Sequence, residues 1–78
     1  MDNRNIVGFR IHEARYKETP TATLKDLSAR LQLQGVALSD SAIGKIEKGI
    51  RPVTDIQIAA FSKALKVSIS WLFEESVK

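Results

Sequence analysis

The chain has 78 residues, of which 44% are hydrophobic and 27% charged, and it contains no cysteine and a single histidine. This length suits one domain, and the composition is that of a globular protein. Without cysteine there is no disulfide or thiolate site, and one histidine cannot form a histidine-based metal site, so we expect no metal and no cofactor. No apolar run approaches the roughly 20 residues of a membrane span, and the N-terminus lacks the apolar core of a signal peptide. We therefore expect a single domain over residues 1–78, located in the cytoplasm and not associated with a membrane.

Positive charge is concentrated in the first two thirds of the chain. Twelve Lys and Arg residues oppose nine Asp and Glu residues, which gives a net charge of +3. Residues 1–53 carry nine bases and six acids, whereas residues 54–78 carry three of each. A basic excess by itself indicates a nucleic-acid partner only weakly, because many small domains have one.

The apolar spacing is helical throughout, and it predicts an all-α domain of five short helices. We expect the first helix to follow Asp2 or Asn3 as its N-cap and to end by Thr19, because Pro20 disfavours helix in the residue before it. The apolar face of this helix would consist of Ile6, Val7, Ile11 and Ala14.

The second and third helices carry clear start and stop signals. Thr23 with Asp26 three residues later resembles a capping box, and Gly35 suits the end of that helix. The third helix would begin at Ser39, with Asp40 near the positive end of the helix dipole, and end at Lys48-Gly49. The inward apolar residues of the two helices would be Leu24, Leu27, Leu31, Ile43 and Ile46.

Two more helices complete the chain. Thr54 and Gln57 match a capping box at the start of the fourth helix, and Ser68 caps a short fifth helix. The apolar face of the fourth helix would comprise Ile58, Ala59, Phe61, Ala64 and Leu65.

Residues 23–49 have the features of a helix-turn-helix. Such a motif needs apolar inner faces and a small residue at the helix contact, and here Ser28 is that residue. The second helix of the motif is the one that begins at Ser39. Its outward residues are short or basic, namely Ser39, Asp40, Ser41, Ala42, Gly44, Lys45 and Lys48. Lys45 can donate to guanine O6 and N7, Ser41 to several base edges, and Asp40 can accept from cytosine N4.

Residues 7–73 resemble an Xre-family helix-turn-helix domain, the kind found in lambdoid phage repressors and Cro. The matching pieces are Val-Gly-x-Arg-Ile-x-x-Ala-Arg (7–15), Thr-x-x-x-Leu-Ser-x-x-Leu (23–31), Ser-x-Ser-x-Ile-x-Lys-Ile-Glu-Lys-Gly-x-Arg-Pro (39–52) and Ala-Leu-x-Val-Ser-x-x-Trp-Leu (64–72). The Ile-Glu-Lys-Gly block is the strongest of them.

The resemblance implies a compact five-helix, lambda-repressor-like domain that binds duplex DNA, usually as a two-fold dimer. By position, the residues that match base readers are Asp40, Ser41 and Lys45. The residues that match phosphate contacts are Thr23, Ser39, Lys48 and Arg51. Arg15 and Glu47 match a buried ion pair that ties the first helix to the end of the recognition helix.

The sequence departs from the family pattern in three places. Leu31 and Ile43 are separated by twelve residues where the pattern has seven, and we interpret residues 32–37 as an extra helical turn plus a longer loop. Leu24 stands where the family usually has Gln, which removes one phosphate contact. The loop after the first helix, through residues 19–21, is also longer.

We therefore expect a sequence-specific transcriptional regulator, a repressor, with double-stranded DNA as its partner and no small-molecule ligand. The alternative is an antitoxin-type or protein-interaction module with the same fold and weak or no DNA binding. An enzyme is not expected, because the acidic residues have no accompanying nucleophile or base. His12 should be an exposed helix residue, and Phe9 a partly exposed aromatic at a protein contact. A weak homodimer would form through an apolar stretch at the C-terminus, comprising Ile69, Trp71, Phe73 and Val77.

Overall fold

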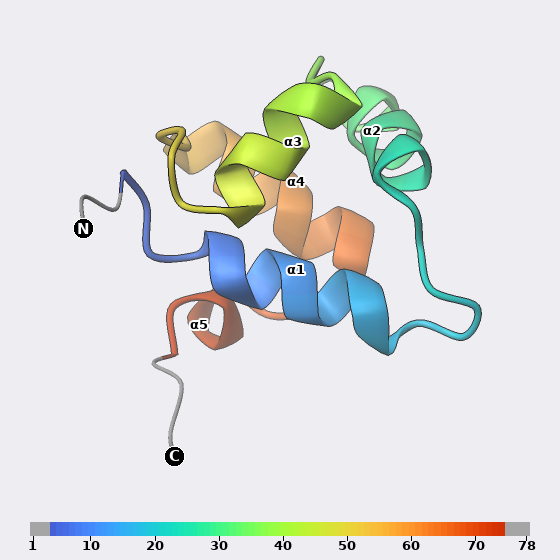
Figure 1. Ribbon diagram of the computed structural model, residues 1–78, viewed down its shortest axis with the longest axis horizontal. Coiled ribbons are helices and arrows are strands. Elements are labelled where there is room, and N and C mark those ends of the chain that lie inside the picture. The colour runs from blue at the N-terminus through green and yellow to red at the C-terminus, as the bar shows by residue number, and fades with distance from the viewer. Residues whose placement is uncertain (1–3, 75–78) are drawn as a thin grey trace.

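The computed structural model describes residues 4–74, and this part of the chain folds into five helices without a strand. The helices are α1 (Gly8–Lys17), α2 (Leu24–Leu33), α3 (Asp40–Glu47), α4 (Asp55–Leu65) and α5 (Ile69–Leu72) (Figure 1). α3 packs on both α2 and α1, α4 lies against α1 and α2, and α5 closes the end formed by α1 and α4. This arrangement leaves one side of α3 uncovered.

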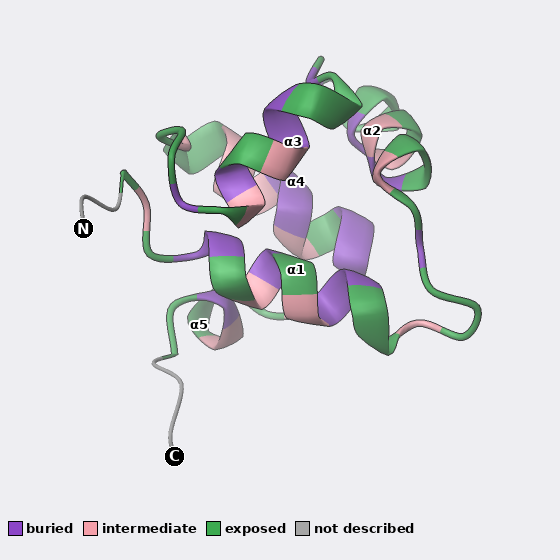
Figure 2. Cartoon of the chain, viewed as in Figure 1, coloured by how far each residue is buried: buried purple, intermediate pink, exposed green. Residues whose placement is uncertain are grey.

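Every helix contributes one face to a single core (Figure 2). The largest fully buried side chains are Val7, Ile11, Leu27, Leu31, Ile43, Ile46, Phe61 and Leu72. The predicted inner faces are confirmed for Val7, Ile11 and Ala14 in α1 and for both isoleucines of α3. Three assignments are wrong: Ile6 is 71% exposed, Ala42 faces the core, and Ala60 is buried where Ala59 was expected.

Four of the five helices begin at the predicted cap. The side chains of Thr23, Ser39, Thr54 and Ser68 each accept a hydrogen bond from the backbone N–H three residues on. Thr23 and Thr54 form complete capping boxes, because the residue at the third helical position bonds back to the N–H of the cap. These helix starts are set by local sequence, and local sequence predicted them.

The start of α1 differs from the prediction. α1 begins at Gly8, so a cap at Asp2 or Asn3 is wrong, and both residues lie outside the described part of the chain. The side chain of Asn5 supplies the missing acceptor, since its Oδ1 accepts from the N–H of Gly8 at 2.7 Å. Its Nδ2 donates to the carbonyl oxygen of Ile46 at 3.1 Å. The beginning of α1 is thus set by a local cap from Asn5, and the bond from the same side chain to the end of α3 holds that cap in place.

The segment between Leu31 and Ser39 ends α2 and forms a partly buried loop. α2 continues to Leu33, and Gly35, with φ of 80°, ends it in the left-handed conformation. In the loop that follows, Val36 and Leu38 are buried, and the Ser28 hydroxyl donates to the Leu38 carbonyl at 2.6 Å. α2 therefore continues only two residues past Leu31, about half a turn rather than the full extra turn expected, and the loop after it contributes Val36 and Leu38 to the core.

The longer loop after α1 is also anchored. Arg30 of α2 donates two hydrogen bonds to the carboxylate of Glu18, at 2.7 and 2.8 Å, and one to the Ala64 carbonyl at 3.3 Å. One guanidinium therefore holds the loop after α1 and the end of α4 against α2.

Candidate nucleic-acid interface

The uncovered side of α3 is a narrow stripe of exposed residues (Figure 2). Ala42, Ile43 and Ile46 face the core, which turns Ser41 and Lys45, one helical turn apart, to the outside. Asp40, Ser41 and Lys45, the predicted base readers, are all exposed on this helix. Within residues 4–74, neither Asp40 nor Lys45 takes part in an ion pair. The stripe therefore presents one acid, one hydroxyl and one base to any ligand along α3.

The four predicted phosphate contacts surround this stripe. Ser39 caps α3, Lys48 follows its last residue, and Arg51 lies in the loop beyond; all three are exposed. Thr23 is exposed at the start of α2. The structure thus places these residues at the two ends of α3 and at the N-terminus of the helix that packs on it.

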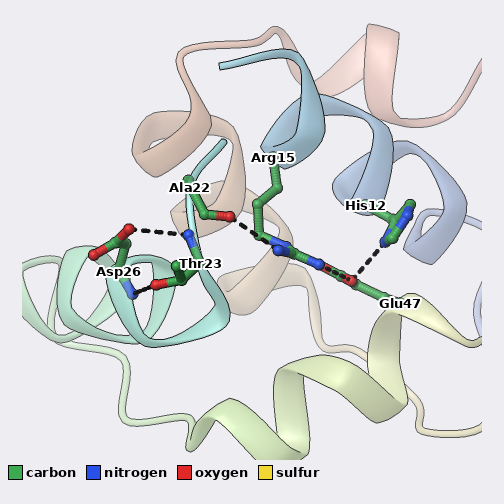
Figure 3. Close-up of polar contacts among 6 residues, drawn as sticks. All are labelled: His12, Arg15, Ala22, Thr23, Asp26 and Glu47. Carbon is green, nitrogen blue, oxygen red and sulfur yellow. Dashed lines mark hydrogen bonds and ion pairs between the residues drawn. The ribbon is translucent and has the colours of Figure 1, made fainter. Parts of the chain in front are cut away.

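The N-terminus of α2 is already occupied by a carboxylate. Asp26 accepts from the N–H of Thr23 at 2.9 Å, and its own N–H donates to the Thr23 hydroxyl at 3.0 Å (Figure 3). The hydroxyl proton of Thr23 is the donor left for a phosphate, since its backbone N–H has a partner. The backbone bond to Thr23 also lowers the pKa of Asp26, so this carboxylate stays charged.

Arg15 and Glu47 lie against each other between α1 and the end of α3 (Figure 3). Arg15 Nε donates to Glu47 Oε2 at 2.7 Å and Nη2 to Oε1 at 2.8 Å, and the two side chains are 9% and 6% exposed. Nη1 donates to the Ala22 carbonyl at 2.9 Å. Burial alone would raise the pKa of Glu47, but the hydrogen bonds from Arg15 and His12 outweigh it and hold this pKa below its ordinary value.

His12 has a role that sequence reasoning missed. It is exposed, as expected, yet its Nδ1 lies 2.9 Å from Glu47 Oε1, so the carboxylate has a second partner on α1. The ring stacks on Tyr16, with centroids 4.3 Å apart. The spacing of three residues between His12 and Arg15 places both on one helix face, and that signal could have paired them.

A cleft of about 400 Å³ opens between α1, α2 and α3. The Arg15–Glu47 pair forms part of its lining, and the other lining residues are Phe9, His12, Leu24, Gly44 and Lys48. Leu24, the departure from the family pattern, is half-buried here and packs on the core. Phe9 is 55% exposed, as its position off the apolar face predicted.

The C-terminal apolar stretch is only partly free. Ile69 and Phe73 are exposed, whereas Trp71 is half-buried beneath the guanidinium of Arg10, 4.5 Å from the ring centroid. Val77 lies outside the described residues. Trp71 thus packs within the chain. Of the four residues expected at a dimer contact, Ile69 and Phe73 are the two that the structure describes as exposed.

The described residues hold no group of His, Cys, Asp and Glu that could bind a metal ion. No helix among them has the length and apolar character that crossing a membrane requires.

Two helices that cross through small and apolar residues, with one side of the second left exposed, define a helix-turn-helix DNA-binding domain. The chain belongs to the helix-turn-helix family HTH_3, of the Xre type, whose family model matches residues 23–72. The match covers α2 to α5, and with the five-helix architecture it confirms the lambda-repressor-like fold. Neither a curated protein nor a solved structure matches the chain.

Proposed function

We propose that this protein is a sequence-specific regulator of transcription, a repressor, that lays α3 in the major groove of duplex DNA. The observation that carries the proposal is the exposed stripe of α3, whose side chains are short or basic. A major groove is wide enough for a helix, and short side chains let the backbone approach the base edges. A domain seated there would block the site for other proteins, which is how a repressor acts.

Asp40, Ser41 and Lys45 are the proposed base readers. Lys45 would donate to guanine O6 and N7, and Asp40 would accept from cytosine N4. Their exposure and their lack of ion-pair partners within residues 4–74 leave these groups free to read bases.

Thr23, Ser39, Lys48 and Arg51 are the proposed phosphate contacts. They bracket α3, so they would fix the register of the helix in the groove without reading sequence. The hydroxyls of Thr23 and Ser39 both accept helix N–H groups and keep their own protons for phosphate oxygens.

The proposed DNA-bound form is a two-fold dimer that is weak without DNA. Half-sites lie roughly 34–36 Å apart along the duplex, and one protomer measures 31 × 25 × 19 Å. Two protomers on adjacent half-sites would therefore meet only at their margins. Ile69 and Phe73, both exposed and four residues apart, are the proposed contacts.

Fluorescence anisotropy with labelled duplex DNA tests the proposal. Binding to random duplex at low salt, and tighter binding to a sequence enriched by selection, are expected. If a dimer neutralises about six phosphates, affinity falls roughly a thousandfold between about 50 and 200 mM salt.

A protein-interaction module, such as an antitoxin, is the second candidate function. Two observations favour it: Leu24 at the start of α2 is apolar and offers no hydrogen bond to a phosphate, and the Asp26 carboxylate lies beside the proposed phosphate contact at Thr23. Absence of DNA binding even at low salt, with the domain folded, would favour this candidate.

A further inference from the structure

His12 lies at the edge of the proposed reading surface, in the cleft that Lys48 also lines. Its side chain lines the cleft between α1, α2 and α3, together with Leu24 at the start of α2 and Lys48 at the end of α3. In a helix-turn-helix complex the first helix of the motif crosses the sugar-phosphate backbone while the second lies in the groove. A strand that runs past the start of α2 and along α3 would cross the mouth of this cleft.

Glu47 determines which nitrogen of His12 carries the proton. The two hydrogen bonds from Arg15 keep the Glu47 carboxylate ionised and acceptor-only. The Nδ1 of His12, 2.9 Å from Oε1, must therefore be the donor in this bond. In a neutral ring the other nitrogen, Nε2, then has no proton and acts as an acceptor.

Nε2 points away from Glu47 and has no hydrogen-bond partner among residues 4–74 (Figure 3). The side chain of His12 is 46% exposed, and the ring nitrogen that bonds to Glu47 is Nδ1, which leaves Nε2 without a described partner. A neutral His12 offers a phosphate oxygen only a lone pair, which repels it. A protonated His12 offers an N–H donor and a positive charge, which attract it.

We propose that His12 is a DNA phosphate contact in its protonated form only, so that DNA binding takes up a proton at Nε2 and strengthens as pH falls. This inference rests on the proposed DNA binding. It adds a contact from α1 to a surface otherwise built from α2 and α3.

The charges around His12 are compatible with this proton uptake. α3 presents Glu47, which stabilises the imidazolium, and Lys48, which opposes it and also draws the phosphate strand inward. α1 presents Arg15, whose charge is balanced by Glu47, and the ring of Tyr16. α2 contributes only Leu24 to the cleft. A phosphate bound at the mouth of the cleft would favour the protonated form of His12 over the neutral form.

The sign of the effect follows from linkage. The protonated form is the binding form, so affinity is higher at the lower pH and falls as pH rises. Uptake of one proton per protomer can change the DNA affinity by at most a factor of about ten per pH unit. A contact between exposed charges changes the affinity by less than this limit. We expect roughly a three- to tenfold loss of affinity per protomer between about pH 5.5 and about pH 8.

Three proteins test the proposal by anisotropy at both pH values: wild type, His12→Gln and His12→Lys. His12→Gln keeps an N–H donor that never carries charge, and His12→Lys keeps a charge throughout this range. Wild type should lose affinity as pH rises, whereas both variants should lose much less, with His12→Lys the tighter of the two at the higher pH. Equal pH dependence in wild type and His12→Gln would overturn the inference.

His12 is the only histidine of the chain, so other histidines cannot confuse the result. The α-amino group also titrates near this range, and His12→Gln retains it as an internal control. Lys45→Ala is the matched variant: it should bind more weakly and keep the wild-type pH dependence. Circular dichroism at both pH values checks that each protein is folded.

Calorimetry separates failure of this inference from failure of the proposed function. Titrations near pH 6.5 in two buffers of different ionisation enthalpy count the protons taken up on DNA binding. Wild type should take up a fraction of a proton per protomer more than His12→Gln. No DNA binding by wild type at either pH would instead remove the proposed function itself.

Discussion

The guanidinium of Arg15 meets the carboxylate of Glu47 through two hydrogen bonds, 2.7 and 2.8 Å long, at the junction of α1 and α3. Glu47 is the last residue of α3, so this contact fixes the end of the proposed recognition helix relative to α1. The pair is almost fully buried, which makes each partner depend on the other.

Glu47→Ala should nearly unfold the domain. Removing one partner leaves a buried charge uncompensated, which typically costs about 3–5 kcal/mol, and a domain of this size has a free energy of unfolding of only about 5 kcal/mol. Urea denaturation measures the loss. The control is a double variant, Arg15→Met with Glu47→Leu, which should recover much of the stability because good apolar packing replaces the pair. A single variant that unfolds at nearly the wild-type midpoint would contradict the prediction.

Acid should weaken the fold through the same carboxylate. The pKa of Glu47 in the folded protein is below its ordinary value, despite the opposing effect of burial, because Arg15 and His12 donate hydrogen bonds to it. A depressed pKa contributes stability that is present above the unfolded pKa, about 4.3, and is lost as pH falls through the folded value. Denaturation midpoints should therefore drop below about pH 4.5 in wild type, and less steeply in the double variant. Parallel pH profiles for the two proteins would argue against Glu47 as a source of this dependence.

Local signals predicted most of the fold. Ser39 and the Thr54–Gln57 box mark helix starts by bonds within one turn, and such bonds are encoded by adjacent residues. The start of α1 was mispredicted because its capping acceptor is Asn5, whose side chain also bonds to the distant end of α3. Ala42 was placed outside because a small residue carries little information about its face, whereas the larger Ile43 and Ile46 were placed correctly.

The exposure of the proposed base readers agrees with the prediction, because the family pattern and helix periodicity gave the same outward positions. The exposed positions of α3 follow from the helical periodicity, once Ile43 and Ile46 are placed on the inner face. His12 was missed because its partner, Glu47, lies thirty-five residues away, although His12 shares a helix face with Arg15, whose pairing with Glu47 was expected. The carboxylate of Asp26 at the start of α2 follows from the capping box, but its effect on a phosphate contact requires the geometry around Thr23.

Gly8→Ala should destabilise the domain. A Cβ at this position would lie 2.0 Å from the carbonyl oxygen of Ile46, a backbone atom, so α1 and α3 would have to separate. Such overpacking typically costs about 1–3 kcal/mol. Gly44→Ala is the matched control, because its Cβ would meet only the Leu24 side chain at 3.6 Å, an ordinary contact. That variant should gain up to about 1 kcal/mol from helix propensity. Equal midpoints for the two variants would show that α1 does not approach α3 this closely.

Ser28→Ala should loosen the inserted loop. The Ser28 hydroxyl donates to the Leu38 carbonyl at 2.6 Å and so joins α2 to the segment that leads into α3. Loss of this bond leaves a part-buried carbonyl without its donor, at a cost of about 1–2 kcal/mol. Ser41→Ala, at an exposed position of α3, should change the free energy of unfolding by less than about 0.5 kcal/mol. Hydrogen exchange of the loop amides should rise in Ser28→Ala and remain at the wild-type rate in Ser41→Ala.

Lys45→Ala and Lys48→Ala should affect DNA binding in different ways. Lys45 lies on the exposed stripe of α3 and is a proposed base reader, so its loss should relax discrimination at one base pair by about 1–3 kcal/mol. Lys48 follows the end of α3 and is a proposed phosphate contact, so its loss should weaken all sequences about equally. It should also reduce the slope of log affinity against log salt by about one. Selection of binding sites from a random library, together with salt titrations, measures both effects. Identical selected sequences for wild type and Lys45→Ala would remove Lys45 from the base readers. An unchanged salt slope in Lys48→Ala would remove Lys48 from the phosphate contacts.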